Sequence, residues 1–213
     1  MPRGGSPGRV IGAVAKWRAD LPGVFVVAID GPGGSGKTTI AAAVAAATGA
    51  ALVHTDDFFM DPPCRPAFRS ASTTPSPERS PRPLAGYYDW RRLRAEALGP
   101  LRARGGATFR RFDWERGHGL DGTVRVERCD LILVEGVFSA APELADLVDR
   151  AVFVGTPEPE RLRRLRLRVA PEDWDEDWLT AERAYFGRAR APSSFDLVVR
   201  GTGPPPADVG AVT

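Results

Sequence analysis

Short apolar runs rich in β-branched residues alternate along the chain with segments of helical periodicity. The run at 24–29 (VFVVAI) is apolar without interruption, which is typical of a strand buried on both faces of a parallel sheet. Similar runs at 50–53, 130–134, 151–154 and 195–199 predict further strands. Because helical segments separate them, the pattern predicts an α/β fold: a doubly wound, five-stranded, mainly parallel sheet.

The helical segments have apolar positions three or four residues apart. Residues 39–48 are rich in alanine and are followed by Gly49, so we expect a helix that ends there. Further helices are expected at 10–19, 89–98, 144–147, 159–169 and 178–190.

Three segments interrupt this alternation. Residues 62–83 contain seven prolines, which predicts a long mobile loop. Residues 107–126 contain two strand-like runs around a glycine-rich turn, which predicts a small β-hairpin insert. Residues 160–190 are rich in arginine near their start and are expected to form a helical lid.

The two ends of the chain are rich in glycine and proline. We expect flexible tails at 1–9 and 202–213, which leaves 10–201 as a single domain. The first segment lacks the apolar core of a secretory signal, and no apolar run reaches the roughly 18 residues of a membrane span. A cytoplasmic location is therefore expected.

Composition and charge limit the classes of binding partner that are expected. The chain of 213 residues has 29 basic and 27 acidic side chains, a net charge of +2, so its charge does not favour a nucleic-acid partner. Its two cysteines cannot build a disulfide framework, and no Cys/His cluster suggests zinc. We expect a small-molecule partner and no membrane partner, and a homo-oligomer stays open.

A glycine-rich loop follows the first predicted strand. Residues 31–38 read GPGGSGKT and fit the pattern GxxxxGK[ST]. Glycines let backbone N–H groups converge on phosphate oxygens, and the following helix points its positive end at the same anion. We therefore expect ATP with Mg²⁺ as the cofactors, although the loop would accept GTP as well. The expected nucleotide-binding residues are Gly31, Gly33, Gly34, Ser35, Gly36, Lys37, Thr38 and Thr39.

Two members of this loop have side chains with chemistry of their own. Lys37, one of only two lysines in the chain, is expected to reach the β- and γ-phosphates. The hydroxyl of Thr38 is expected to bind Mg²⁺.

Acidic residues follow two of the other predicted strands. Asp56 and Asp57 follow the strand at 50–53, and Glu135 follows the strand at 130–134. In open α/β sheets, ligands bind outside the carboxyl ends of the strands. Asp56 could accept a proton from a substrate hydroxyl while helping to hold Mg²⁺, and Glu135 could ligate the same ion. A capping role fits Asp57 equally well.

Five further motifs occur in a set order after the glycine-rich loop: TDDFF at 55–59, YDW at 88–90, FDW at 112–114, VEG at 134–136, and VFV with RLRR within 152–164. From about residue 24 to residue 201 this order resembles the uridine kinase-like family, which is similar to phosphoribulokinase and bacterial pantothenate kinase. The resemblance implies a P-loop NTPase fold.

The resemblance also implies roles for single residues. Asp56 matches the catalytic base of the family, Asp89 matches an aspartate that holds ribose hydroxyls, and Phe112 matches a tyrosine beside the nucleobase. Arg164 is expected to offset charge on the γ-phosphate. The resemblance adds the following residues to the substrate site: Asp57, Phe59, His118, Arg166 and Arg168.

The sequence departs from the family pattern at two of these places. Phe112 lacks the tyrosine hydroxyl, and Arg168 is followed by Val-Ala-Pro instead of aspartate. We expect ATP-dependent phosphorylation of a primary hydroxyl on a small metabolite, with uridine or cytidine as the first candidates. A kinase of pantothenate, a sugar or an antibiotic-like nucleoside stays open, as does a slow ATPase with a regulatory role.

Overall fold

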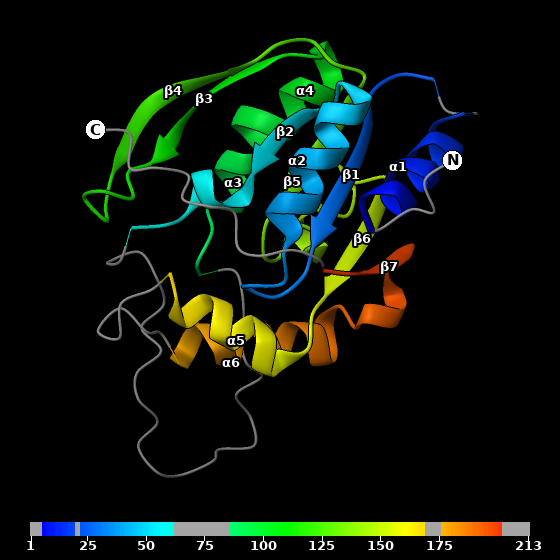
Figure 1. Ribbon diagram of the computed structural model, residues 1–213. Helices are drawn as coiled ribbons and strands as arrows, with labels where there is room; N and C mark the ends of the chain where they lie inside the picture. The colour runs from blue at the N-terminus through cyan, green and yellow to red at the C-terminus, as the bar shows by residue number, and fades with distance from the viewer. Residues whose placement is uncertain (1–5, 20–21, 62–85, 169–175, 202–213) are drawn as a thin grey trace.

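Five parallel strands form the central sheet. The computed structural model describes residues 6–19, 22–61, 86–168 and 176–201. The strands are β1 (Phe25–Asp30), β2 (Ala51–His54), β5 (Leu131–Glu135), β6 (Arg150–Gly155) and β7 (Leu197–Arg200). They lie in the order β2-β5-β1-β6-β7 (Figure 1), and every pairing is parallel. This confirms the predicted α/β fold.

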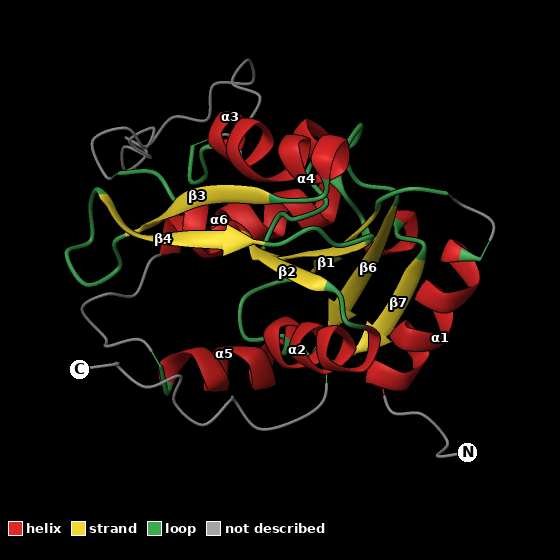
Figure 2. Ribbon diagram, turned by 90° about the horizontal axis from the view of Figure 1, so that it is seen from above, coloured by secondary structure: helices red, strands yellow, loops and turns green. Residues whose placement is uncertain are grey.

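Helices cover both faces of this sheet, which explains the uninterrupted apolar runs. Helices α1 (Ser6–Arg18) and α2 (Lys37–Thr48) lie on one face. On the other lie α3 (Trp90–Arg92), a π-helical segment (Leu93–Leu98) and α4 (Gly99–Arg104) (Figure 2). Alternate residues of β1 therefore enter different cores: Val27 packs with α1 and α2, and Val26 packs on the opposite side.

The predicted hairpin is present as a separate two-stranded sheet. Strand β3 (Ala107–Phe112) pairs antiparallel with β4 (Leu120–Val126). Strand β3 lies against the π-helical segment and against a 3₁₀ turn at Thr55–Phe58 that directly follows β2. The hairpin is thereby placed beside the carboxyl end of the sheet.

The segment expected to form a lid contains two helices. These are α5 (Glu158–Arg166) and α6 (Glu176–Ala184), and α6 runs on into a π-helical turn at Tyr185–Ala189. Further 3₁₀ turns occur at Pro142–Leu144 and Pro192–Ser194.

Two local expectations were wrong. Helix α1 begins at Ser6, so residues 6–9 are not a tail; the Ser6 hydroxyl donates to the carbonyl of Arg200 and ties the helix to β7. In place of the helix expected at 144–147, the chain forms the 3₁₀ turn at Pro142–Leu144. The predicted loop at 62–83 and the tail at 202–213 lie outside the described residues. Within the described part, no helix is long and apolar enough to cross a membrane.

A buried carboxylate fixes the end of β1, where the glycine-rich loop begins. Asp30 is fully buried and accepts hydrogen bonds from the N–H groups of Phe138 (2.9 Å) and Ala140 (3.0 Å) and from the Tyr185 hydroxyl (2.8 Å). Burial raises the pKa of Asp30 to about 6, and these hydrogen bonds oppose the shift. The carboxylate therefore joins β1, the segment after β5 and the π-helical turn that follows α6.

We expect Tyr185→Phe to lower the free energy of unfolding by about 2 kcal/mol at pH 7.5, because a hydrogen bond to a charged group is lost. At pH 5 Asp30 is protonated in the folded protein, so the loss is expected to be smaller. The hydroxyl favours the ionised carboxylate, and its contribution therefore grows as the pH rises through about 6. Urea unfolding at both pH values measures the difference; an equal loss at both would contradict this role of Asp30.

Candidate active site

The glycine-rich loop connects β1 to α2 and has the backbone conformation that its glycines allow. Gly34 and Gly36 have φ angles of +74° and +91°, which side chains other than glycine rarely adopt. A Cβ atom on Gly34 would also lie 2.5 Å from the carbonyl oxygen of Arg161. The glycines thus determine the shape of the loop, and α5 packs directly against it.

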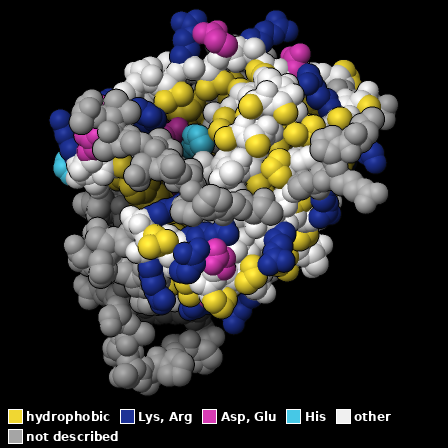
Figure 3. Space-filling view, in the orientation of Figure 1, with side chains coloured by type: hydrophobic (Ala, Val, Ile, Leu, Met, Phe, Trp, Pro, Cys, Tyr) yellow, Lys and Arg dark blue, Asp and Glu magenta, His cyan; other side chains and the backbone are white. Residues whose placement is uncertain are grey.

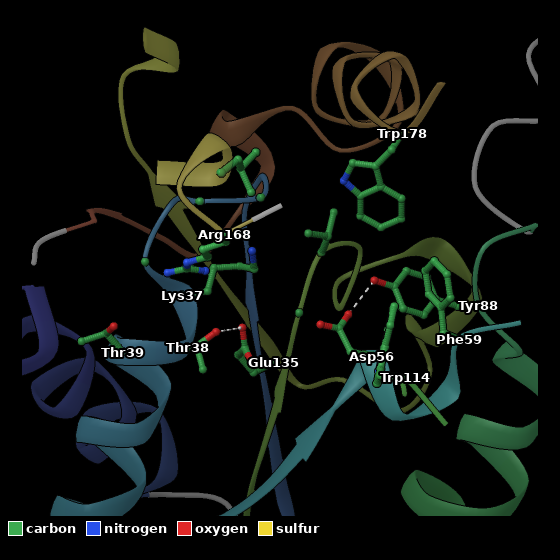
Figure 4. A pocket seen from close by; sticks show the side chains of 16 residues that line it. Lys37, Thr38, Thr39, Asp56, Phe59, Tyr88, Trp114, Glu135, Arg168 and Trp178 are labelled. Atoms are coloured by element: carbon green, nitrogen blue, oxygen red, sulfur yellow. Dashed lines mark hydrogen bonds between the residues drawn. The ribbon is translucent and has the colours of Figure 1, made fainter. Parts of the chain in front are cut away.

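A cavity of about 660 Å³ opens at the carboxyl end of the sheet. Part of its lining comes from the loop and the start of α2: Gly33, Gly34, Gly36, Lys37, Thr38 and Thr39. Another part is aromatic: Phe59, Tyr88, Trp114 and Trp178. Figure 4 shows Lys37, Thr38 and Glu135 to one side and the aromatic rings of Phe59 and Tyr88 to the other, with Asp56 between them. Gly31 and Ser35 are buried and do not line the cavity.

Thr38 and Glu135 form an oxygen-rich corner of this cavity. The Thr38 hydroxyl donates to Oε1 of Glu135 (3.1 Å), and Nδ1 of His54 lies 2.9 Å from Oε2 (Figure 4 shows the first contact). Burial disfavours ionisation of Glu135, but His54, Lys37 and Thr38 outweigh it and lower the pKa of the carboxyl. Glu135 is therefore an anion at neutral pH.

This corner fits Mg²⁺. The ion prefers hard oxygen ligands and is usually held by one or two carboxylates together with substrate phosphates and water. Among the described residues, no group of three His, Cys, Asp or Glu side chains could hold a metal by itself. Thr38, Glu135 and the nearby Asp56 would have to share Mg²⁺ with the phosphates of a nucleotide.

Asp56 lies on the 3₁₀ turn after β2 and faces the cavity. Its carboxylate accepts a hydrogen bond from the Tyr88 hydroxyl (2.9 Å). The residue is solvent-accessible from the cavity, but protein surrounds it elsewhere. This partial desolvation is the main reason why the pKa of Asp56 is raised, and the negative charge of Glu135 raises it further. The hydrogen bond from Tyr88 opposes the rise. A carboxylate with a raised pKa is suited to general base chemistry.

The three predicted lid arginines lie in different surroundings. Arg168 lines the cavity, whereas Arg164 is buried behind the loop. Nε of Arg164 donates to Glu160 (2.9 Å), and its Nη1 lies 3.4 Å from the Gly34 carbonyl oxygen. Arg166 is exposed and outside the lining. In Figure 3, Lys and Arg side chains gather on the part of the surface where α5 lies.

Four other predicted substrate residues lie outside the cavity lining. Asp89 caps α3, where it accepts the N–H of Arg92 (3.0 Å). Phe112 is buried behind Phe59, with ring centroids 5.6 Å apart. His118 is exposed in the β3–β4 turn, and Asp57 is half-buried beside Asp56 with a pKa raised by burial.

Three aromatic residues of the lining were not among the predicted substrate residues: Tyr88, Trp114 and Trp178. Tyr88 and Trp114 belong to the motifs YDW and FDW. The two motifs therefore pointed to the right segments, but Asp89 and Phe112 were chosen from them as the substrate residues. Trp114 is 55% exposed, and its ring centroid lies 4.8 Å from that of Phe59 and 4.9 Å from that of Phe112, so it extends the aromatic lining toward solvent.

Neither a protein-family model nor a curated protein matches this sequence. Solved structures do match. A possible uridine kinase from Bacillus stearothermophilus is 22% identical, with a TM-score of 0.64 over 90% of this chain and 98% of that one. A candidate fructose transport system kinase from Silicibacter sp. TM1040 is 21% identical, with a TM-score of 0.61 over 92% and 99%. D-glycerate 3-kinase from Cryptococcus neoformans var. grubii is 16% identical, with a TM-score of 0.52 over 90% and 88%.

The chain has the fold of these kinases. At such identities the likeness establishes the fold, and it confirms the uridine kinase-like P-loop kinase fold that the motif order predicted. The three kinases are named for different acceptors, so the fold alone selects none of them.

Proposed function

We propose that this protein is an ATP-dependent kinase that transfers the γ-phosphoryl group to a primary hydroxyl of a small metabolite. One observation carries the proposal: Asp56, a carboxylate with a raised pKa, lines the same cavity as the glycine-rich loop and the aromatic wall. A phosphate chain on the loop and a hydroxyl compound against the wall would meet at this carboxylate.

The loop end binds and orients the nucleotide. The N-terminus of α2 and the loop amides favour the negative phosphates. Lys37 is almost buried and its Nζ lies 3.1 Å from the Pro32 carbonyl oxygen, so its charge is held at the loop. Bound Mg²⁺ supplies further neutralisation of phosphate charge, and Thr38 and Glu135 would hold it.

Asp56 takes the proton from the attacking hydroxyl. The Tyr88 hydroxyl binds one carboxylate oxygen and so orients the other toward the cavity. Phosphoryl transfer depends mainly on positioning and charge stabilisation, and Arg168 at the cavity rim adds a cation on the side of the loop.

The aromatic wall favours an acceptor with a flat ring. Trp114, 55% exposed at the edge of this lining, offers a ring face on which a nucleobase would stack, and a planar base gains more from such stacking than a sugar or a glycerate does. A nucleoside, with uridine or cytidine first, therefore remains the best candidate. The product would be the 5′-monophosphate.

We expect Tyr88→Phe to move the acidic limb of the turnover–pH profile to higher pH. The hydrogen bond from Tyr88 favours the ionised form of Asp56, so its loss raises the pKa of the base. A base acts in its ionised form, and turnover is then lost at a higher pH than in the wild type. Initial rates across pH 5–9 measure the shift; an unchanged acidic limb would count against Asp56 as the base.

An acceptor screen tests the proposed function. Consumption of ATP is measured with nucleosides, pentoses, pantothenate and aminoglycosides, and mass spectrometry of the product must show one added phosphate. A nucleoside-dependent signal supports the proposal. Steady ATP hydrolysis that no hydroxyl compound changes would favour a regulatory ATPase instead.

A further inference from the structure

Glu182 joins the nucleotide-binding loop to the lid helices. It lies on α6, and its carboxylate is completely buried. Its Oε1 accepts the N–H of Gly33 at 2.6 Å and the Nε1–H of Trp178 at 2.8 Å, and its Oε2 accepts from Nη1 of Arg161 at 3.0 Å. Three donors thus come from the loop, from α6 and from α5.

This junction is fixed rather than loosely packed. Arg161 is only 5% exposed, so both charges of the pair are buried. Charge-assisted hydrogen bonds are short and strong, and removing one partner leaves an uncompensated buried charge. The Glu182 carboxylate therefore holds its three donors in one geometry.

Trp178 extends the junction into the acceptor end of the cavity. Its indole ring lines the cavity and makes edge contacts with Tyr87 (centroids 4.9 Å apart) and Tyr88 (6.1 Å). Figure 4 shows the ring of Trp178 descending from its helix toward Tyr88. Since Tyr88 holds Asp56, one line of contacts runs from Gly33 through Glu182 and Trp178 to the proposed base.

We propose that Glu182 is a positioning residue that couples nucleotide binding to the shape of the acceptor site. The coupling rests on the proposed nucleotide site. Gly33 and Trp178 share the same oxygen of Glu182, so a change in the Gly33 peptide on phosphate binding alters the hydrogen bond that holds the indole. Hydrogen bonds in a buried network influence one another in this way. A bound nucleotide therefore determines the position of the Trp178 ring, against which the acceptor packs.

The indole N–H of Trp178 reports on this bond directly. In ¹H–¹⁵N spectra of the full chain, Trp178→Phe assigns the signal. The probe is Mg²⁺ with a non-hydrolysable ATP analogue, and calorimetry follows binding separately. In the wild type the analogue should shift the Trp178 signal and leave that of Trp17, on α1, in place.

Variants of Glu182 separate positioning from packing. Glu182→Met keeps the length of the side chain but offers no oxygen acceptor, so the Trp178 signal should no longer respond once calorimetry shows that the variant is saturated with the analogue. Glu182→Gln keeps one oxygen for Gly33 and Trp178 but turns its NH2 group toward Nη1 of Arg161, where two donors meet, so the response should be weaker than in the wild type but not lost. The matched control is Glu158→Gln, because Glu158 is a half-exposed partner of the same Arg161, whereas the indole N–H donates to Glu182; it should behave as the wild type.

The outcomes distinguish the two proposals. Binding of the analogue without a Trp178 shift in the wild type, or an intact shift in Glu182→Met, overturns the coupling alone. If Glu182→Met does not fold, the wild-type titration decides by itself. Failure of the wild type to bind any nucleotide overturns the proposed function, and the coupling with it.

Discussion

Asp56→Asn is expected to bind ATP like the wild type and to turn over about 10²- to 10⁴-fold more slowly, the usual contribution of a general base. Asparagine has almost the same shape and can still accept the hydrogen bond from Tyr88, but it cannot take a proton from the acceptor hydroxyl. Steady-state kinetics with a nucleotide-binding measurement separate the two effects. The effect should therefore appear in kcat.

The matched control for this variant is Asp121→Asn. Asp121 is an exposed aspartate on β4, outside the cavity, so the same change of charge there should leave kcat within twofold of the wild type. Near-normal turnover of Asp56→Asn would remove Asp56 from the role of base.

Lys37→Met is expected to lower kcat by about 10²- to 10³-fold, the range seen when one preorganised donor is removed from a transition state. Nucleotide binding should also weaken, because the ammonium is held at the loop by the Pro32 carbonyl and its charge faces the phosphates. The affinity for the nucleotide and the turnover are measured on the same preparation.

The chain offers an internal control, since it has one other lysine. Lys16 is exposed on α1, and Lys16→Met removes an equal charge away from the cavity. Equal losses in the two variants would indicate a general effect of net charge and would contradict a specific role for Lys37.

The sequence predicted the parts of the site that follow directly from strands. Glu135 comes directly after an apolar run, Asp56 comes shortly after another, Lys37 follows one through the glycine-rich loop, and parallel strands bring their carboxyl ends to one edge of the sheet. The cavity does collect these three residues there. Apolar runs and a glycine-rich loop were sufficient to predict these positions, because both are local patterns in the sequence.

The acceptor end was harder to predict, because motif order does not say which side chain faces a cavity. In YDW the tyrosine lines it and the aspartate caps a helix; in FDW the phenylalanine is buried and the tryptophan lines it. The hydrogen bond between Gly33 and Glu182 joins residues 149 positions apart, and no local pattern reveals such a contact.

Transfer of label from γ-labelled ATP shows whether the protein phosphorylates a hydroxyl compound with Asp56 as the base. The wild type, Asp56→Asn and Asp121→Asn are each incubated with Mg²⁺ and the acceptors of the screen, and labelled product is separated from free phosphate. We expect label on a hydroxyl compound with the wild type and Asp121→Asn, and almost none with Asp56→Asn. Label that appears only as free phosphate, whatever acceptor is added, would contradict this expectation.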